Sequence, residues 1–222
     1  MENFLFLSLY FIFALLTILV VLIGRQRIQY IFKPLLIPLL IMYYIFNVPL
    51  LEVNWFIVAG LTCGLVGNVF FMHLEEDEMF YHGVLAHILG YGFYIFAFFG
   101  YFVEFPGFHL WKLLLFLPGL LIVVFILYQI RGDYEIVKLA MIGYILGVFI
   151  MYIFSIFFLP TSQGGDFWLL WLGTILLLLS SIIIAINKFR KDIPHTEALF
   201  LGIYYLAQFF IIEAIIITTL MA

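Results

Sequence analysis

Polar side chains of types that could do chemistry recur at one depth in four strongly apolar stretches of the chain. His87 can transfer protons, whereas Asn68 and Ser181 can hold a substrate by hydrogen bonds. Counted along a helix, each lies roughly 6–10 Å inside its stretch. The same layer holds Ser180, Tyr91, Tyr94, Tyr204, Tyr205 and Gln208. Because polar groups are costly in hydrocarbon, the layer predicts either a shared polar cavity or hydrogen bonds between helices.

His87 belongs to a regular pattern of small and polar residues. Gly83, His87, Gly90 and Tyr94 follow the spacing i, i+4, i+7, i+11, which places them on one helix face. Glycines let a neighbouring backbone approach closely, so His87 and Tyr94 should face the helix that packs there. The pattern is more typical of a packed, hydrogen-bonded core histidine than of a catalyst, and both interpretations stay open.

Glu213 is a carboxylate well inside the last apolar stretch. A glutamate within a membrane span is a candidate functional residue, because an unpaired charge there is costly. Glu213 lies roughly 22 Å from the end of the stretch that carries the polar layer. It could act in catalysis, or it could be protonated or reach the opposite membrane surface.

The segment His73-Leu-Glu-Glu-Asp-Glu-Met-Phe-Tyr-His82 gathers side chains that suit zinc or manganese. Its spacing matches no zinc-binding signature, so a solvated acidic loop is the favoured interpretation. The sequence also has no glycine-rich phosphate loop and no G-x-S-x-G nucleophile motif. We therefore expect neither a metal nor another cofactor.

The composition is that of an integral membrane protein. Of 222 residues, 67% are hydrophobic and only 10% are charged, whereas soluble domains have about 25% charged residues. Nine lysines and arginines against thirteen acidic residues give no basic excess, which excludes a nucleic-acid binder. Cys63 is the only cysteine, which excludes a disulfide scaffold.

About 20 apolar residues are needed to cross the hydrocarbon of a bilayer, and the chain offers eight such stretches. They predict an all-α, polytopic helical bundle that forms a single transmembrane domain over 1–222. The second stretch is short and contains Pro34 and Pro38, so we expect it to be tilted or irregular. The predicted spans are about 4–23, 34–47, 55–73, 79–100, 109–130, 135–159, 166–187 and 197–221.

The distribution of basic residues orients these spans. Connections on the cytoplasmic side of a membrane protein carry an excess of lysine and arginine. One set of alternate connections holds Arg25, Arg27, Lys33, Arg131, Lys138, Lys188, Arg190 and Lys191, and the other set holds only Lys112. We therefore expect a multi-pass protein of the bacterial inner membrane with both termini non-cytoplasmic and the polar layer in the cytoplasmic half.

Several short motifs, in order along the spans, resemble the YhhN family, which includes the lysoplasmalogenases. The resemblance covers most of the chain and implies a helical membrane enzyme. In this family a Gly-Asp pair and a Ser-Asp pair supply two carboxylates, where this chain has Asn68 and Ser181. The family histidine falls on Tyr91, and His87 lies one turn earlier. The matching motifs are Lys33-Pro34, Gly67-Asn68, Phe80 and Gly83 with Tyr94 and Phe98, Tyr144 with Met151, Ser180-Ser181, Ala185 with Asn187 and Phe189, and Tyr204-Tyr205-Leu-Ala-Gln208.

Lysoplasmalogenases hydrolyse the vinyl ether bond of lysoplasmalogens to a fatty aldehyde and a glycerophospho-base. This reaction needs a proton delivered to carbon and then water at the resulting oxocarbenium ion. Two buried carboxylates suit both tasks, because burial keeps a carboxyl group protonated enough to act as an acid. Without them, His87, Glu213 or a residue of the acidic loop must supply the proton.

The resemblance therefore implies a hydrolase of the vinyl ether or ether bond of lysolipids, with reduced or altered activity. The alternative is a non-catalytic lipid-binding or structural protein on the same scaffold, and a transporter is a third, weaker reading. Either main reading makes membrane lipids, and a lysolipid in particular, the partner. The candidate catalytic residues are His87, Asn68, Ser181 and Glu213, and the candidate substrate-binding residues are Lys33, Tyr91, Tyr94, Tyr204, Tyr205 and Gln208.

Overall fold

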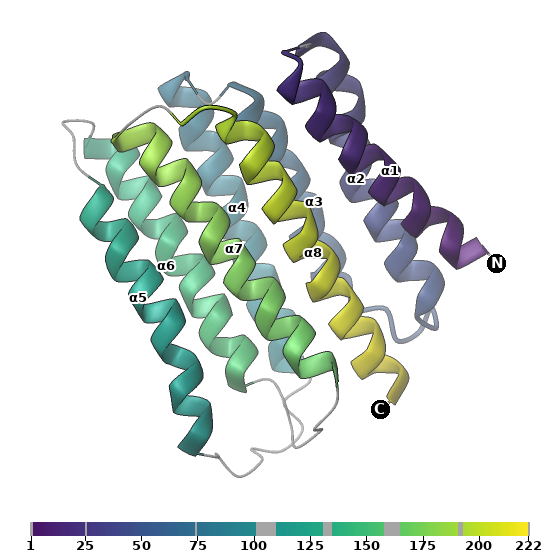
Figure 1. The fold of residues 1–222 in the computed structure, drawn as a ribbon. Helices are drawn as coiled ribbons and strands as arrows, with labels where there is room; N and C mark the ends of the chain where they lie inside the picture. Colours follow the sequence, from purple (N-terminus) through teal and green to yellow (C-terminus); the bar gives the residue numbers. More distant parts are fainter. Residues whose placement is uncertain are drawn as a thin grey trace.

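The apolar stretches form long helices in the computed structural model (Figure 1). The structure describes residues 2–24, 26–73, 75–100, 110–130, 135–157, 165–190 and 193–221. Within these ranges it has eight α-helices and two short 3₁₀ segments, which confirms the prediction of an all-α bundle. They are α1 (Glu2–Leu22), α2 (Gln26–Asn47), α3 (Trp55–Phe70), η1 (Phe71–His73), α4 (Asp77–Gly100), η2 (Leu110–Leu115), α5 (Phe116–Gln129), α6 (Glu135–Phe157), α7 (Gly165–Phe189) and α8 (Thr196–Met221).

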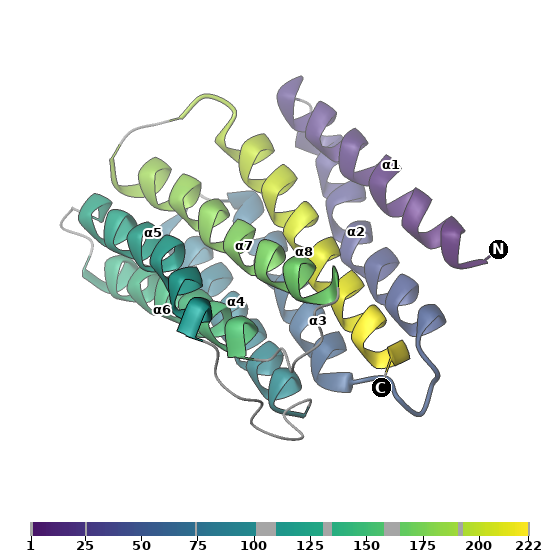
Figure 2. The same ribbon diagram turned by 60° about the horizontal axis from the view of Figure 1, so that its bottom comes forward.

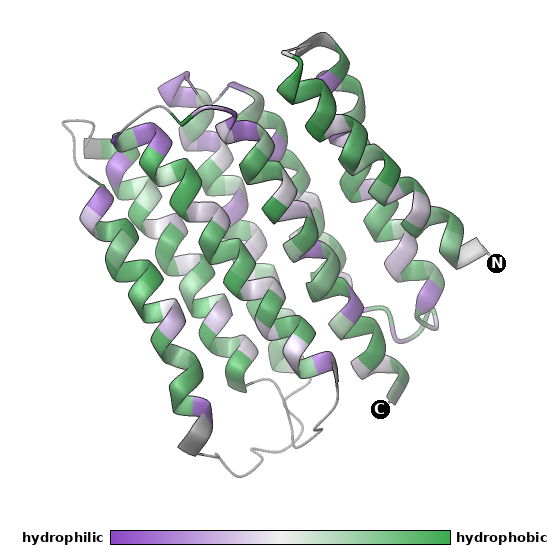
Figure 3. Ribbon diagram, viewed as in Figure 1, coloured by the Kyte–Doolittle hydropathy of each residue, from purple (hydrophilic) through white to green (hydrophobic). Residues whose placement is uncertain are grey.

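Every one of the eight α-helices, together with the flanking 3₁₀ turns of α3 and α5, is long and apolar enough to cross a membrane. Large apolar side chains such as Leu121 and Leu139 remain about 70% exposed, at 68% and 71%. Exposure on that scale suits a surface that faces lipid tails rather than water. Figure 3 shows apolar residues over the length of the helices and hydrophilic residues toward their ends. The chain is a multi-pass membrane protein.

Helices that follow one another along the chain pack as pairs. The most extensive contacts join α7 to α8, α3 to α4 and α1 to α2, and α4 also packs on α6. Of the described spans, α8 is the most buried and α1 the least. Figure 2 shows α8 between α7 on one side and α2 on the other. The last helix is therefore the centre of the bundle, and it positions residues against several partners.

The second helix differs from its prediction. The sequence predicts a short, irregular span over 34–47, but α2 is continuous over Gln26–Asn47 and contains Pro34 and Pro38. A membrane helix tolerates proline because neighbouring groups satisfy the freed backbone. Lys33 therefore lies inside a helix instead of in a connection, and its charge is accommodated by Glu197, as described below.

The other helix ends lie close to those predicted. The fifth span begins as the 3₁₀ turn η2 before α5, and α7 extends two residues beyond its predicted end. Residues 158 and 159 of the sixth predicted span lie outside the described residues, as do Arg25, Arg131 and Lys191, which helped to orient the chain. The orientation stays a prediction.

Candidate functional site

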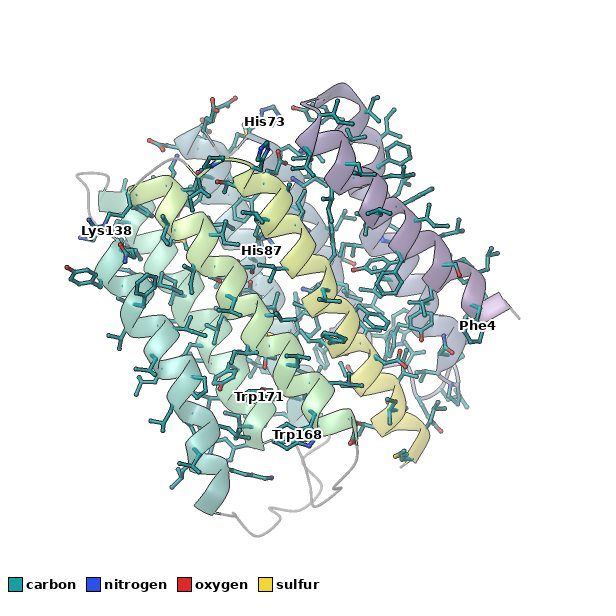
Figure 4. All side chains as sticks on the ribbon, viewed as in Figure 1. Phe4, His73, His87, Lys138, Trp168 and Trp171 are labelled. Carbon is teal, nitrogen blue, oxygen red and sulfur yellow. The ribbon has the colours of Figure 1, made fainter. Side chains whose placement is uncertain are left out.

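His87 lies in the interior of the bundle, surrounded by aromatic rings from three other elements. It is 1% exposed. The centroid of its ring lies 5.1 Å from that of Phe71, 5.6 Å from Tyr204, 5.8 Å from Tyr144 and 6.1 Å from Tyr91. Figure 4 shows His87 deeper in the bundle than His73, toward the same end. We call His87, Asn68, Tyr91, Tyr144 and Tyr204 the histidine cluster.

Glycines of α3 make room for this cluster. A Cβ atom on Gly67 would lie 2.5 Å from Cδ2 of the His87 ring, and one on Gly64 would lie 2.5 Å from the Tyr204 hydroxyl. Deeper in the membrane, Gly60 and Gly90 let α3 and α4 approach, with the Gly60 carbonyl oxygen 3.0 Å from a Cβ built on Gly90. The predicted small-residue face of α4 therefore packs against α3.

The histidine cluster has hydrogen-bonding capacity that the described residues do not use. Nε2 of His87, both side-chain polar atoms of Asn68 and the hydroxyls of Tyr91, Tyr144, Tyr204 and Tyr205 are buried and make no hydrogen bond of ordinary geometry among the described residues. Some of these groups lie near one another: the Tyr204 hydroxyl is close to Asn68 and Gln208. A buried polar group without a partner costs free energy, and more so in a membrane interior. These atoms can bind a polar group of a ligand.

Other residues of the predicted polar layer do form hydrogen bonds, either between helices or within one helix. The Tyr94 hydroxyl donates to Oε1 of Gln208 at 2.7 Å. The Ser180 and Ser181 hydroxyls donate to the Leu177 carbonyl oxygen of their own helix, at 2.7 and 3.0 Å. The layer is thus part structural and part unsatisfied.

Tyr144 of α6 is a member that sequence reasoning left out of the site. Its hydroxyl lies close to those of Ser180, Ser181 and Tyr91. Tyr144 lies nine residues from the start of α6 and Ser180 nine residues from the end of α7, so both are about 14 Å deep. The depth count that found Ser180 would have found Tyr144 if it had been applied to the sixth span.

An ion pair that is buried at its lysine and partly exposed at its glutamate joins α2 to α8 beside the histidine cluster. Lys33 is 1% exposed, and its Nζ lies 2.9 Å from Oε1 of Glu197. The side-chain amide of Gln29 donates to the same oxygen. Lys33 also interacts electrostatically with His87. Glu197 was missed by sequence reasoning, although a basic residue and an acidic residue at the same predicted depth could have indicated the pair.

A polar pocket of about 510 Å³ opens at this end of the bundle. Its wall includes Tyr30, His73, Glu75, Glu76, Asn187 and Glu197. Phe71 also lines the pocket, and the same ring contacts His87. The pocket is therefore separated from the histidine cluster by a single aromatic side chain, with the Lys33–Glu197 pair beside it.

Glu213 lies apart from these residues, as its sequence position indicated. The Tyr43 hydroxyl donates to its Oε2 at 2.7 Å. Glu213 is nine residues beyond Tyr204 in α8, which is about 14 Å along the helix. The structure does not bring Glu213 to His87, and the aromatic side chains that it describes around His87 are Phe71, Tyr91, Tyr144 and Tyr204, none of which carries a carboxylate.

The acidic segment between α3 and α4 is held by surface ion pairs. Asp77 lies 2.7 Å from the Lys188 ammonium, and His73 lies 3.6 Å from Glu76. Among the described residues, no three His, Cys, Asp or Glu side chains are grouped so that they could hold a metal ion.

Comparison with known families gives one match, to the YhhN family, over residues 28–215. This chain belongs to the YhhN family. No curated protein and no solved structure matches it. The YhhN match runs from α2 into α8 and includes the histidine cluster, the Lys33–Glu197 pair and the polar pocket, whereas α1 lies outside it.

Proposed function

We propose that this YhhN-family protein binds a lysolipid and hydrolyses its vinyl ether or ether bond, in a reaction like that of the lysoplasmalogenases. The observation that carries the proposal is the histidine cluster, a group of unpartnered polar atoms around His87 inside a membrane bundle. The polar pocket, which Phe71 separates from His87, would bind the lipid headgroup. A lipid linkage held next to His87 would satisfy atoms that protein groups leave unpaired.

The chemistry of a vinyl ether sets what the cluster must do. A proton adds to the double-bond carbon that does not carry oxygen, and the double-bond electron pair forms the new C–H bond. The positive charge then rests on the other carbon and the ether oxygen as an oxocarbenium ion. Water adds to that carbon and releases a proton, and the hemiacetal breaks its C–O bond to give an aldehyde and a glycerol hydroxyl. One water is consumed and the proton is returned.

His87 is the proton donor in this proposal, because a protonated imidazole is a stronger acid than the phenol and amide groups that make up the rest of the histidine cluster. Asn68 and the Tyr144 and Tyr204 hydroxyls can hydrogen-bond the ether oxygen or the attacking water. The Ser181 hydroxyl lies close to that of Tyr144. Lys33, paired with Glu197, places a fixed charge between the polar pocket and the cluster.

The second candidate function is binding of a lysolipid without hydrolysis. It is favoured by the residues around His87, which include no carboxylate, and by Asn68 and Ser181 at the two positions where the family resemblance implies aspartates. The same cluster would then recognise the lipid linkage and leave it intact.

Aldehyde release from a panel of vinyl-ether, alkyl-ether and ester lysolipids tests both functions. The purified protein is expected to release aldehyde from a vinyl-ether lysolipid, and His87→Ala is expected to lower the rate by about 10²-fold or more, the usual contribution of a general acid. His82→Ala, an exposed histidine on the same helix, is the matched control. Glu213→Gln tests the remaining intramembrane carboxylate.

The outcomes separate the candidates. Saturable lysolipid binding without aldehyde, weakened by His87→Ala, supports the binding function. Robust hydrolysis that survives both His87→Ala and Glu213→Gln contradicts the role of His87. The proposal also keeps the predicted location, with the polar pocket on the cytoplasmic side of a bacterial inner membrane.

A further inference from the structure

A groove runs between α1 and α8 on the lipid-facing side of the bundle. It has a volume of about 240 Å³. Figure 1 shows α1 at the edge of the bundle and α8 next to it on the inner side. The floor is hollow where Ala14 faces Gly202, because a Cβ on Gly202 would meet only Ile18 Cδ1, at 3.5 Å. The groove is lined by Tyr10, Ala14 and Ile18 of α1 and by Gly202, Tyr205 and Leu206 of α8, among others.

The length and depth of the groove match one leaflet of a bilayer. From Tyr10 to Ile18 the α1 wall covers eight residues, which is about 12 Å. Half the hydrocarbon thickness is about 15 Å. Ile18 and Gly202 both lie toward the end of the bundle that carries the polar pocket. A single lipid chain entering from that leaflet would therefore lie along the groove.

Tyr205 of the groove lies on the same helix as a wall residue of the polar pocket. Its ring lines the groove, and Glu197, eight residues earlier in α8, lines the polar pocket. The Tyr205 hydroxyl is buried and has no hydrogen-bond partner among the described residues. The Tyr205 ring also contacts Tyr204, at 5.7 Å between centroids, and Tyr204 contacts His87. An amphiphile placed across this junction would bring its linkage close to the histidine cluster.

We propose that the α1–α8 groove is the binding site for the alkyl chain of a lysolipid whose headgroup occupies the polar pocket. The identity of the lipid rests on the proposed function. The free glycerol hydroxyl that a lysolipid carries in place of a second chain meets the unpartnered Tyr205 hydroxyl. A diacyl lipid has an apolar chain at that position and offers no such group. The α1 wall lies outside the residues matched by the family model.

Photo-crosslinking tests this proposal without relying on activity. The full-length protein is placed in nanodiscs of diacyl phosphatidylcholine with a small fraction of a lysolipid that carries a diazirine in its alkyl chain, and the adducts are mapped by mass spectrometry. Adducts are expected to concentrate on the groove residues of α1 and α8. Excess unlabelled lysolipid should displace the probe, and added diacyl lipid should not.

Two glycine variants give a matched comparison. Gly202→Leu fills the groove and is expected to lower its crosslinking about tenfold, because overfilling a site costs on that scale. Gly92→Leu is the control, since a Cβ at Gly92 meets nothing within 4 Å. The wild-type adduct map keeps the proposal testable if Gly202→Leu fails to fold.

Adducts spread evenly over the lipid-facing helices, adducts between two copies of the chain, equal displacement by diacyl lipid or unchanged labelling of Gly202→Leu would each overturn the proposal. Labelling confined to the groove without aldehyde release would retain the chain site and reject the hydrolase. Aldehyde release with labelling elsewhere would do the reverse.

Discussion

Gly67 determines how closely the His87 ring can approach α3. A methyl group at this position would fall 2.5 Å from the ring, which is shorter than the non-bonded contacts that Cβ atoms make in proteins. We expect Gly67→Ala to lower the free energy of unfolding by about 1–3 kcal/mol, because the ring is enclosed by other aromatic side chains and has to move. Thermal unfolding in detergent measures this. Gly92→Ala should leave stability unchanged or slightly raised, and equal losses in both variants would contradict the packing described.

Asn68 and Ser181 offer a second measurement on single residues. Replacing both by aspartate, Asn68→Asp with Ser181→Asp, should raise vinyl-ether hydrolysis, since an acid positioned near the bond typically contributes about 10²–10⁴-fold. Aldehyde release from the lysolipid panel gives the answer. The thermal stability of the double variant must be measured alongside, because unpaired buried acids cost several kcal/mol. A folded double variant with no gain over wild type would contradict the assigned role of these positions.

The positions of His87, Asn68, Tyr204 and Gln208 in one layer could be predicted, because depth along a helix follows from counting residues. Whether a given polar atom has a partner could not, because that depends on side-chain direction and on which helices are neighbours. Tyr94 and Tyr204 lie on different helices and look alike in the sequence, yet only the Tyr94 hydroxyl forms a hydrogen bond among the described residues.

The Lys33–Glu197 pair acts at the scale of elements, because it ties α2 to α8. Lys33→Met leaves the Glu197 carboxylate with only Gln29, so we expect a loss of stability. The double variant Lys33→Met with Glu197→Gln removes both charges and should be more stable than Lys33→Met alone, since breaking a buried pair costs more than removing it whole. Unfolding of the three proteins in detergent provides the comparison. A double variant less stable than the single one would contradict the pairing.

Helix boundaries show the limit of sequence reasoning for elements. Seven of the eight spans could be predicted to within a few residues, because apolar runs bounded by polar ones define them. The first turns of α2 could not be predicted, because the polar residues Gln29 and Lys33 are typical of a connection between spans. In the structure both side chains bind Glu197 of α8, which lies far away in the sequence, and this contact lets them lie within a helix.

The orientation of the whole molecule is the prediction that the structure leaves to experiment. With Cys63 replaced by Ala, a Leu51→Cys variant places a thiol in the connection between α2 and α3, where Leu51 is fully exposed. An Arg190→Cys variant places one after α7. From outside intact cells, an impermeant maleimide should label the first and not the second. The reverse pattern would invert the topology and put the polar pocket on the opposite side.

The pairing of Lys33 with Glu197 also has a consequence for how the protein is made. The two residues are 164 positions apart, so Lys33 leaves the ribosome long before its partner does. A lone lysine in a membrane helix costs about 2.5–3.5 kcal/mol at the bilayer centre, and less where its long side chain can reach the surface. Until α8 has been inserted, the Lys33 side chain of α2 must therefore stay near the membrane surface. Since α8 is also the most buried of the described helices, the helices made before it complete their packing only after α8 has been inserted. A chain truncated before α8 would leave α2 without its counter-charge.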